Sequence, residues 1–151
     1  MLKLVETSSG QTLVGNDPTL QSEAVADDSD KTFTVPAGKQ WTIKSIYALL
    51  VSTATVGNRI LTVLFTKADN TTVLEIRAGV AQAASLTYRY GLFPGAAFNT
   101  TVANNFSLTP IPPDFVLPAG YKVRIYDSAA IAAAADDLTL QMLVDESQLV
   151  A

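Results

Sequence analysis

The chain contains no histidine and no cysteine among its 151 residues. Without cysteine, neither a disulfide framework nor a thiolate metal site can form. The absence of histidine removes the commonest general base and metal ligand, so serine–histidine and cysteine–histidine nucleophile systems are excluded. There is also no glycine-rich phosphate loop and no dinucleotide-binding motif. The sequence therefore predicts neither an enzyme nor a cofactor.

Charge is scarce as well. Charged residues make up 16% of the chain, whereas about a quarter is typical of globular proteins. The net charge is −4 and the ten lysines and arginines are scattered singly, so nucleic acid is not an expected partner. With 48% hydrophobic residues, this composition favours a surface partly buried against other proteins, although a neutral, threonine-rich β-protein would share it.

Long hydrophobic runs are missing too. No apolar stretch approaches the ~18 residues that a membrane-spanning helix requires, and the longest candidate, residues 46–51, has the length of a strand. Residues 1–6 lack the apolar segment of a signal peptide. We therefore expect neither a membrane partner nor an export signal.

From Lys31 onward, apolar and polar residues alternate with the period of two that indicates β-strands. Turn residues interrupt the alternation roughly every eight to fifteen residues, which predicts about eight short strands and almost no helix. Only residues 129–135, after Asp127 and Ser128, are expected to form about one or two helical turns. The predicted fold is all-β, an antiparallel two-sheet sandwich or jelly roll.

The longest predicted strand runs from Trp41 to Val51. Its odd-numbered residues are predicted to share one face, while its even-numbered face changes from polar at residues 40–44 to apolar at residues 46–50. A strand with apolar residues on both faces passes into a covered region or an interface.

Two turns share a motif, because residues 35–43 and 117–125 both have the pattern apolar–Pro–Ala–Gly–x–x–apolar–x–Ile. Proline presets φ for the second position of a turn, and glycine suits its end. Since a jelly roll consists of two interleaved Greek keys, we interpret the repeat as matching strand starts rather than chance. The residues that define these turns are Pro36, Gly38, Pro118 and Gly120.

The turn residues and acidic residues within positions 1–30 predict an extended N-terminal arm, followed by a sandwich domain over residues 31–145 and a short tail over residues 146–151. Such arms are often ordered by a partner. The alternative is a loose N-terminal strand packed on the chain's own sheet. The candidate partner-binding residues of the arm are apolar: Leu2, Leu4, Leu13, Val14 and Leu20.

Carboxylates supply the remaining candidates for chemistry. Asp127, Asp136 and Asp137 are the best potential calcium ligands, but they lack the spacing of an EF-hand and are better explained as turn and cap residues. Adjacent residues of a strand point to opposite faces, so Asp136 and Asp137 make a poor acid–base pair. The enzyme alternative, a glycosidase built on carboxylates alone, would draw on these residues or on Asp69, Glu75 and Asp114.

Aromatic residues offer one further alternative, a carbohydrate-binding receptor module that stacks sugars on an exposed aromatic row. Each candidate has apolar neighbours two residues away, which favours packing in the core or between subunits instead. The candidates are Trp41, Tyr88, Tyr90 and Tyr121.

Several stretches together resemble small structural proteins of tailed bacteriophages. The resemblance covers about residues 31–145 and lies in the turn-to-strand segment 35–43, the Val-Gly-Asn-Arg sequence 56–59, the second turn 117–121, the Arg-Ile-Tyr-Asp sequence 124–127 and the Ala/Asp loop that follows it. It implies a β-sandwich component of the virion, most like a capsid decoration (cement) protein. Such proteins, often homotrimers, clamp subunits of the major capsid protein after synthesis in the bacterial cytoplasm. Head-fibre, neck and tail components are alternatives within this class.

Overall fold

The computed structural model describes the backbone of residues 5–6, 12–23 and 28–150, and the side chains of residues 18–22 and 28–148. The described backbone has strands and turns but no helix, and residues 129–135, expected to be helical, form successive turns. No helix that could cross a membrane occurs in this part of the chain. The strands are β1 (Val5–Glu6), β2 (Thr12–Glu23), β3 (Asp30–Thr34), β4 (Lys39–Val51), β5 (Leu61–Thr66), β6 (Thr72–Arg77), β7 (Thr87–Pro94), β8 (Phe106–Ile111), β9 (Val116–Leu117), β10 (Lys122–Asp127) and β11 (Asp137–Val150).

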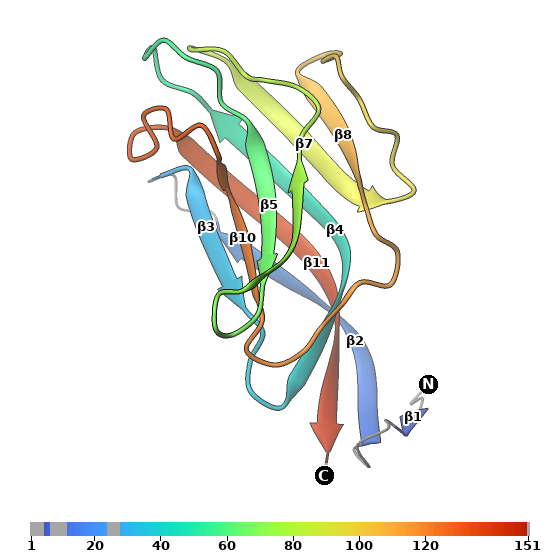
Figure 1. The fold of residues 1–151 in the computed structure, drawn as a ribbon. Helices are drawn as coiled ribbons and strands as arrows, with labels where there is room; N and C mark the ends of the chain where they lie inside the picture. The colour runs from blue at the N-terminus through green and yellow to red at the C-terminus, as the bar shows by residue number, and fades with distance from the viewer. Residues whose placement is uncertain (1–4, 7–11, 24–27, 151) are drawn as a thin grey trace.

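The strands form two sheets that pack face to face (Figure 1). Sheet A is seven-stranded, with the order β1-β2-β11-β4-β7-β8 and β9 paired to β4. Sheet B is four-stranded, with the order β3-β10-β5-β6. Neighbouring strands are antiparallel except for β7 and β8, which run parallel.

The strand order is that of a jelly roll. β2 pairs with β11, β3 with β10, β4 with β7 and β5 with β6, as in one long hairpin. Rolling up such a hairpin brings β4 beside β11 and β5 beside β10, and both of these pairs are present. The predicted all-β sandwich or jelly roll is therefore confirmed.

The core lies between the two sheets and is built from alternate residues of the strands. In β10, Val123 and Ile125 are fully buried while their neighbours are half-buried. A period of two places every second side chain on the same face, so β11 contributes Leu138, Leu140, Met142 and Val144 from the other side.

Strand β4 contains a bulge at Lys44. Between Leu143 and Val144 of β11, the pairing with β4 passes from Ser45 to Ile43 and skips Lys44. The extra residue reverses which side chains face inward. The predicted single odd-numbered face is therefore wrong, because the core side chains of β4 are Trp41, Ile43, Ile46, Ala48 and Leu50.

The two Pro-Ala-Gly turns lie side by side and have the same geometry. In each, the amide after glycine donates a hydrogen bond to the proline carbonyl, over 3.2 Å at Pro36 and 3.1 Å at Pro118. Proline is thus the first residue of each turn, not the second as predicted. Gly38 and Gly120 have φ of +73° and +80°, which glycine adopts without strain. Val35 exchanges two backbone hydrogen bonds of 2.9 Å with the second turn.

Sheet A includes two segments that were predicted to lie outside the sandwich domain, residues 12–23 and 146–150. Residues 12–23 of the expected arm form β2, which pairs with β11 from Leu140–Glu23 to Val150–Thr12. Residues 146–150 of the expected tail are the end of β11. Figure 1 shows these two strands projecting beyond the rest of the sandwich. The alternation is weak here, since residues 15–18 read Gly-Asn-Asp-Pro, and pairing with the neighbouring strand supplies the order.

Candidate functional site

The outer surface of sheet A is apolar over much of its area. The register places Leu143 between Leu20 of β2 and Ser45 of β4, and it places Tyr47 beside Gly91 of β7. These side chains point away from the core because their chain neighbours Ile46, Ala48 and Met142 point into it. We call this surface the apolar face and define it by Leu20, Tyr47, Leu49, Val51, Phe93, Phe106, Leu108 and Leu143.

All of these residues remain at least partly exposed. Leu20 is 57% exposed, and Tyr47, Val51, Phe93 and Leu143 are each close to two-fifths exposed. Single exposed apolar residues are ordinary on soluble proteins. Several of them on adjacent strands of one sheet form a continuous patch, which is typical of an interaction surface.

Gly91 shapes one half of the apolar face. A Cβ atom at this position would lie 3.0 Å from Cζ of Phe106 and 3.2 Å from Cδ2 of Leu108. The missing side chain therefore lets these two residues of β8 fold over β7. The ring of Phe93 also lies near this position, with Cε1 3.6 Å from where the Cβ atom would be. We call Phe93 and Phe106, which lie on either side of Gly91, the aromatic pair.

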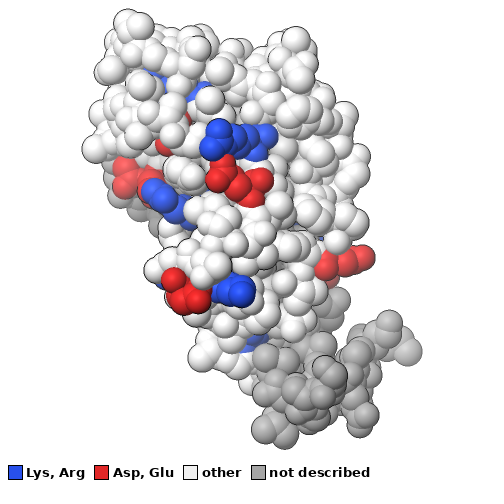
Figure 2. Space-filling model, in the orientation of Figure 1, with Lys and Arg blue, Asp and Glu red and all other residues white. Residues whose placement is uncertain are grey.

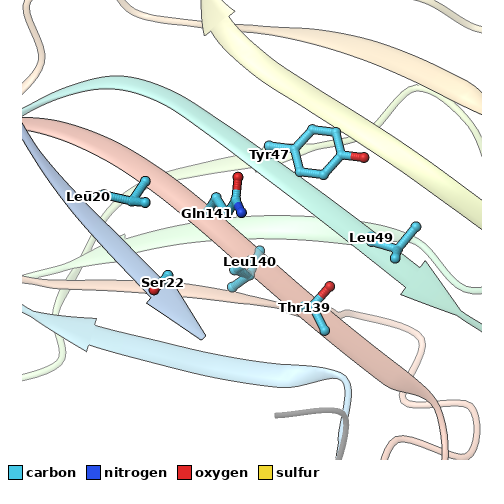
Figure 3. A pocket seen from close by; sticks show the side chains of 7 residues that line it. All are labelled: Leu20, Ser22, Tyr47, Leu49, Thr139, Leu140 and Gln141. Atoms are coloured by element: carbon cyan, nitrogen blue, oxygen red, sulfur yellow. The ribbon is translucent and has the colours of Figure 1, made fainter. Parts of the chain in front are cut away.

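The other half of the apolar face is hollowed by a shallow groove of about 260 Å³. Leu20 of β2 and Tyr47 of β4 stand on either side of β11, which carries Thr139 and Gln141 between them (Figure 3). The groove holds no charged side chain among its lining residues. Its apolar walls and neutral polar floor suit a protein surface of similar character rather than a charged ligand.

Charged residues are few on the apolar face. Arg89 is exposed and lies inside the face, between Leu49 of β4 and Phe106 of β8 in the register. Asp137 is opposite Val51 at one end, and Lys44 pairs with Asp145 over 2.9 Å at the other. The face thus combines mostly apolar side chains with one arginine, a residue that is itself enriched in protein interfaces.

The outer surface of sheet B has the opposite character, and Figure 2 shows its positive and negative side chains beside one another. Arg124 pairs with Asp30, and Arg77 with Glu75 over 2.6 Å. The hydrogen bonds that Arg124 donates to the Asp30 carboxylate raise the pKa of Arg124, although partial burial opposes this. We call this surface the polar face and define it by Asp30, Thr32, Leu64, Thr66, Glu75, Arg77, Lys122, Arg124 and Tyr126.

A buried ion pair ties the two sheets together at one end of the sandwich. Arg59, before β5, donates from Nε to Asp136, before β11, over 2.7 Å, and both side chains are fully buried. Thr53 adds hydrogen bonds of 2.7 and 2.9 Å to the same carboxylate. The guanidinium also reaches the carbonyl oxygens of Thr55 and Gly57. Burial alone would raise the pKa of Asp136, but the bonds from Arg59 and Thr53 lower it below its ordinary value.

Asp127, another aspartate considered as a calcium ligand, also has its carboxylate engaged by hydrogen bonds within the fold. Asp127 is buried and accepts hydrogen bonds from the amides of Ile60, Ala129 and Ile131, so it acts as a cap for the loop. No cluster of acidic residues that could hold a metal ion occurs within the described ranges. The candidate calcium ligands Asp127, Asp136 and Asp137 therefore do not assemble into a site, and Asp127 has the capping role that the sequence favours.

The aromatic residues considered for sugar stacking do not form an exposed row. Trp41 and Tyr90 are buried, with 2% and 1% exposure. Trp41 Nε1 donates to Glu146 over 2.9 Å, and the Tyr90 hydroxyl donates to Gln82 over 3.1 Å. Burial raises the pKa of Tyr90. These side chains stabilise the interior. The exposed aromatic residues include Tyr47 and Phe93 on the apolar face and Phe98 in a loop outside it.

The candidate residues of the expected arm are placed unequally. Leu2 and Leu4 lie outside the described residues. Leu13 and Val14 belong to β2, where the structure describes the backbone alone. Leu20 is the member of this group that joins the apolar face.

Fold and surface together define an all-β jelly-roll protein with one apolar and one polar outer face. No known protein family and no curated protein sequence matches the chain.

Solved structures of infectious bursal disease virus are similar to the chain at low scores. The structure of the Gx strain matches with 12% identity and a TM-score of 0.34, covering 90% of this chain and 36% of that chain. The Gt strain matches with 13% identity and a TM-score of 0.32, covering 97% and 42%. The VP2 subviral particle matches with 16% identity and a TM-score of 0.30, covering 89% and 34%. The chain thus spans well under half the length of these viral chains, and so distant a likeness supports no conclusion about its function.

Proposed function

We propose that this chain is a non-enzymatic structural protein of a virus particle, and more specifically a phage capsid decoration protein. In this role it binds the outer surface of the capsid, where it holds neighbouring capsid subunits together. The observation that supports an assembly role best is the apolar face, a mostly apolar surface that extends over five strands of the jelly roll. A surface of this kind is suited to burial against protein.

Two further features agree with the proposal. The sequence resembles small virion proteins of tailed bacteriophages over residues 35–43 and 117–127. The described residues contain no cluster of metal-binding side chains, and the two most buried aspartates serve the fold. A homotrimer would attach through several equivalent contacts, so that modest affinity at each one gives tight overall binding.

The decisive experiment is cosedimentation of the purified chain with capsids of a tailed phage that lack their decoration protein. We expect saturable binding and a higher temperature of capsid disruption in its presence. Binding to isolated tails or necks but not to heads would move the chain to those parts of the virion. Absence of binding to every virion part would overturn the proposal.

A further inference from the structure

We infer that the apolar face is the surface through which copies of this chain associate with one another. The inference deepens the proposed function by assigning its self-association to one surface, but it can be tested without any capsid.

The size of the apolar face fits one side of a stable interface. The face extends across five neighbouring strands of sheet A, β2-β11-β4-β7-β8. With ~4.8 Å between strands and ~3.3 Å per residue over about seven residues of β4, it measures roughly 24 by 23 Å. Because side-chain relief adds accessible area to this projection, the face is on the order of the ~800 Å² that each partner contributes to a standard interface.

The charge distribution favours a second copy as the occupant. The groove has no charge with which to select an acidic or a basic partner. Arg89 lies within the face between Leu49 and Phe106, and Asp137 lies at its end opposite Val51. These two residues have opposite signs, so two identical faces can offer each other a counter-charge. The acidic side chains of the polar face, Asp30 and Glu75, lie on the opposite side of the sandwich and do not meet when apolar faces approach. The net charge of −4 therefore presents little obstacle to association on this side.

The two halves of the face also suit a partner of the same kind. One half has the groove between Leu20 and Tyr47, and the other has the ring of Phe93, which is 38% exposed. A copy brings a ring for the groove and a groove for the ring, and contacts of this kind can close into a ring of subunits such as the proposed trimer when each copy binds the next. Capsid attachment then uses surfaces that remain open after association, among them the loops between strands.

The test compares one substitution on each face. Leu49 lies on β4 and Leu64 on β5, and both are half-buried, outward-facing leucines in internal strands of their sheets. Each lies next to an arginine in the register, Arg89 and Arg124 respectively. The molar masses of wild-type chain, Leu49→Glu and Leu64→Glu are measured by light scattering on a sizing column, with circular dichroism as the check of folding. We expect an oligomer for wild type and Leu64→Glu, and a monomer for Leu49→Glu.

If Leu49→Glu does not fold, Leu20→Glu replaces it, because a leucine that is 57% exposed can accept charge without disturbing the core. A monomeric wild-type chain overturns the inference, as does an unchanged mass for the folded apolar-face variants or equal dissociation by Leu64→Glu. Failure of capsid binding by a chain that oligomerises through Leu49 would remove the virion proposal and leave this inference standing.

Discussion

The two outer surfaces of the sandwich are built by the same rule and have opposite properties. Both sheets send every second side chain into a shared core, so the outward positions are free to vary. On sheet B these positions hold ion pairs such as Arg77–Glu75 and Arg124–Asp30. On sheet A they hold Tyr47, Leu49 and the aromatic pair on either side of Gly91. The jelly roll therefore does not dictate an apolar exterior, and the apolar face is a property of this sequence that requires its own explanation.

The difference has a direct energetic meaning. Burying an exposed leucine or tyrosine against a partner releases about 25 cal/mol for each Å² of apolar surface removed from water. Burying a charged pair instead requires desolvation that the pair's attraction often fails to offset. The apolar face thus gains from being covered, whereas the polar face gains most from remaining in water. Association through the polar face would bury little apolar surface and would require desolvation of its ion pairs.

The largest expected effect concerns the buried pair that holds the two faces in one body. Arg59→Met leaves the Asp136 carboxylate buried without its counter-charge, so we expect stability to fall by about 3–5 kcal/mol. Urea unfolding followed by tryptophan fluorescence measures this change. In the double variant Arg59→Met/Asp136→Asn no buried charge remains, and part of the loss should be regained. A double variant less stable than Arg59→Met would show that the carboxylate is stabilised by Thr53 alone.

The pH dependence of stability tests the same buried pair, because wild type and Arg59→Met should respond to pH in opposite directions. In wild type the pKa of Asp136 is held below its ordinary value of 3.8, so its contribution to stability is present above that value and is lost as pH falls through the folded-state pKa. In Arg59→Met, burial is no longer opposed by the guanidinium and the pKa should rise. The variant then loses stability as pH rises through its folded-state pKa. The difference in unfolding free energy between wild type and Arg59→Met should therefore become smaller as the pH falls. A difference that grows below about pH 4 would contradict this account.

A smaller effect is expected from the glycine that shapes the apolar face. In Gly91→Ala the new methyl would crowd Phe106 and Leu108, and overpacking of this kind costs about 1–3 kcal/mol. We expect the low end of that range, since both contacts are ends of side chains that can move outward. The measurement is the urea midpoint of Gly91→Ala, alone and together with Phe106→Leu. The loss of stability caused by Gly91→Ala should be smaller in the Phe106→Leu background than in wild type. Equal losses would mean that the packing of Phe106 over β7 does not depend on Gly91.

Alternation in the sequence was sufficient to predict the sheets because it records burial directly. It failed in β4, where the bulge at Lys44 exchanges the two faces of the strand. The core residues are therefore odd-numbered before the bulge and even-numbered after it, so a strict period of two does not identify them. It left residues 12–23 open between an extended arm and a strand of the chain's own sheet, and β2 shows the second alternative. The pairing of β2 with β11, rather than its own hydrophobic pattern, decides between the two. The turns were recognisable from Pro-Ala-Gly, although their register differed by one residue.

The candidate surface was harder to predict because it depends on which strands are neighbours. Leu143 breaks the alternation of β11, since its outward neighbours are Thr139 and Gln141. That break becomes informative only when β11 is known to lie beside Leu20 and Tyr47. The Arg59–Asp136 pair joins residues 77 positions apart, and no local pattern indicates such a contact.

The smallest effect is expected on the polar face. Glu75→Gln removes one partner of an ion pair whose arginine is 61% exposed, and pairs of this kind contribute roughly 0–1 kcal/mol because water and salt screen them. The free energy of unfolding, measured by urea titration, should therefore fall by no more than about 1 kcal/mol. The molar mass in light scattering should stay that of wild type. The matched substitution on the other side, Tyr47→Gln, removes a ring from the groove of the apolar face and should lower the mass at the same protein concentration. If Glu75→Gln lowered the mass and Tyr47→Gln did not, the two faces would have exchanged roles, and association would depend on charge rather than on apolar burial.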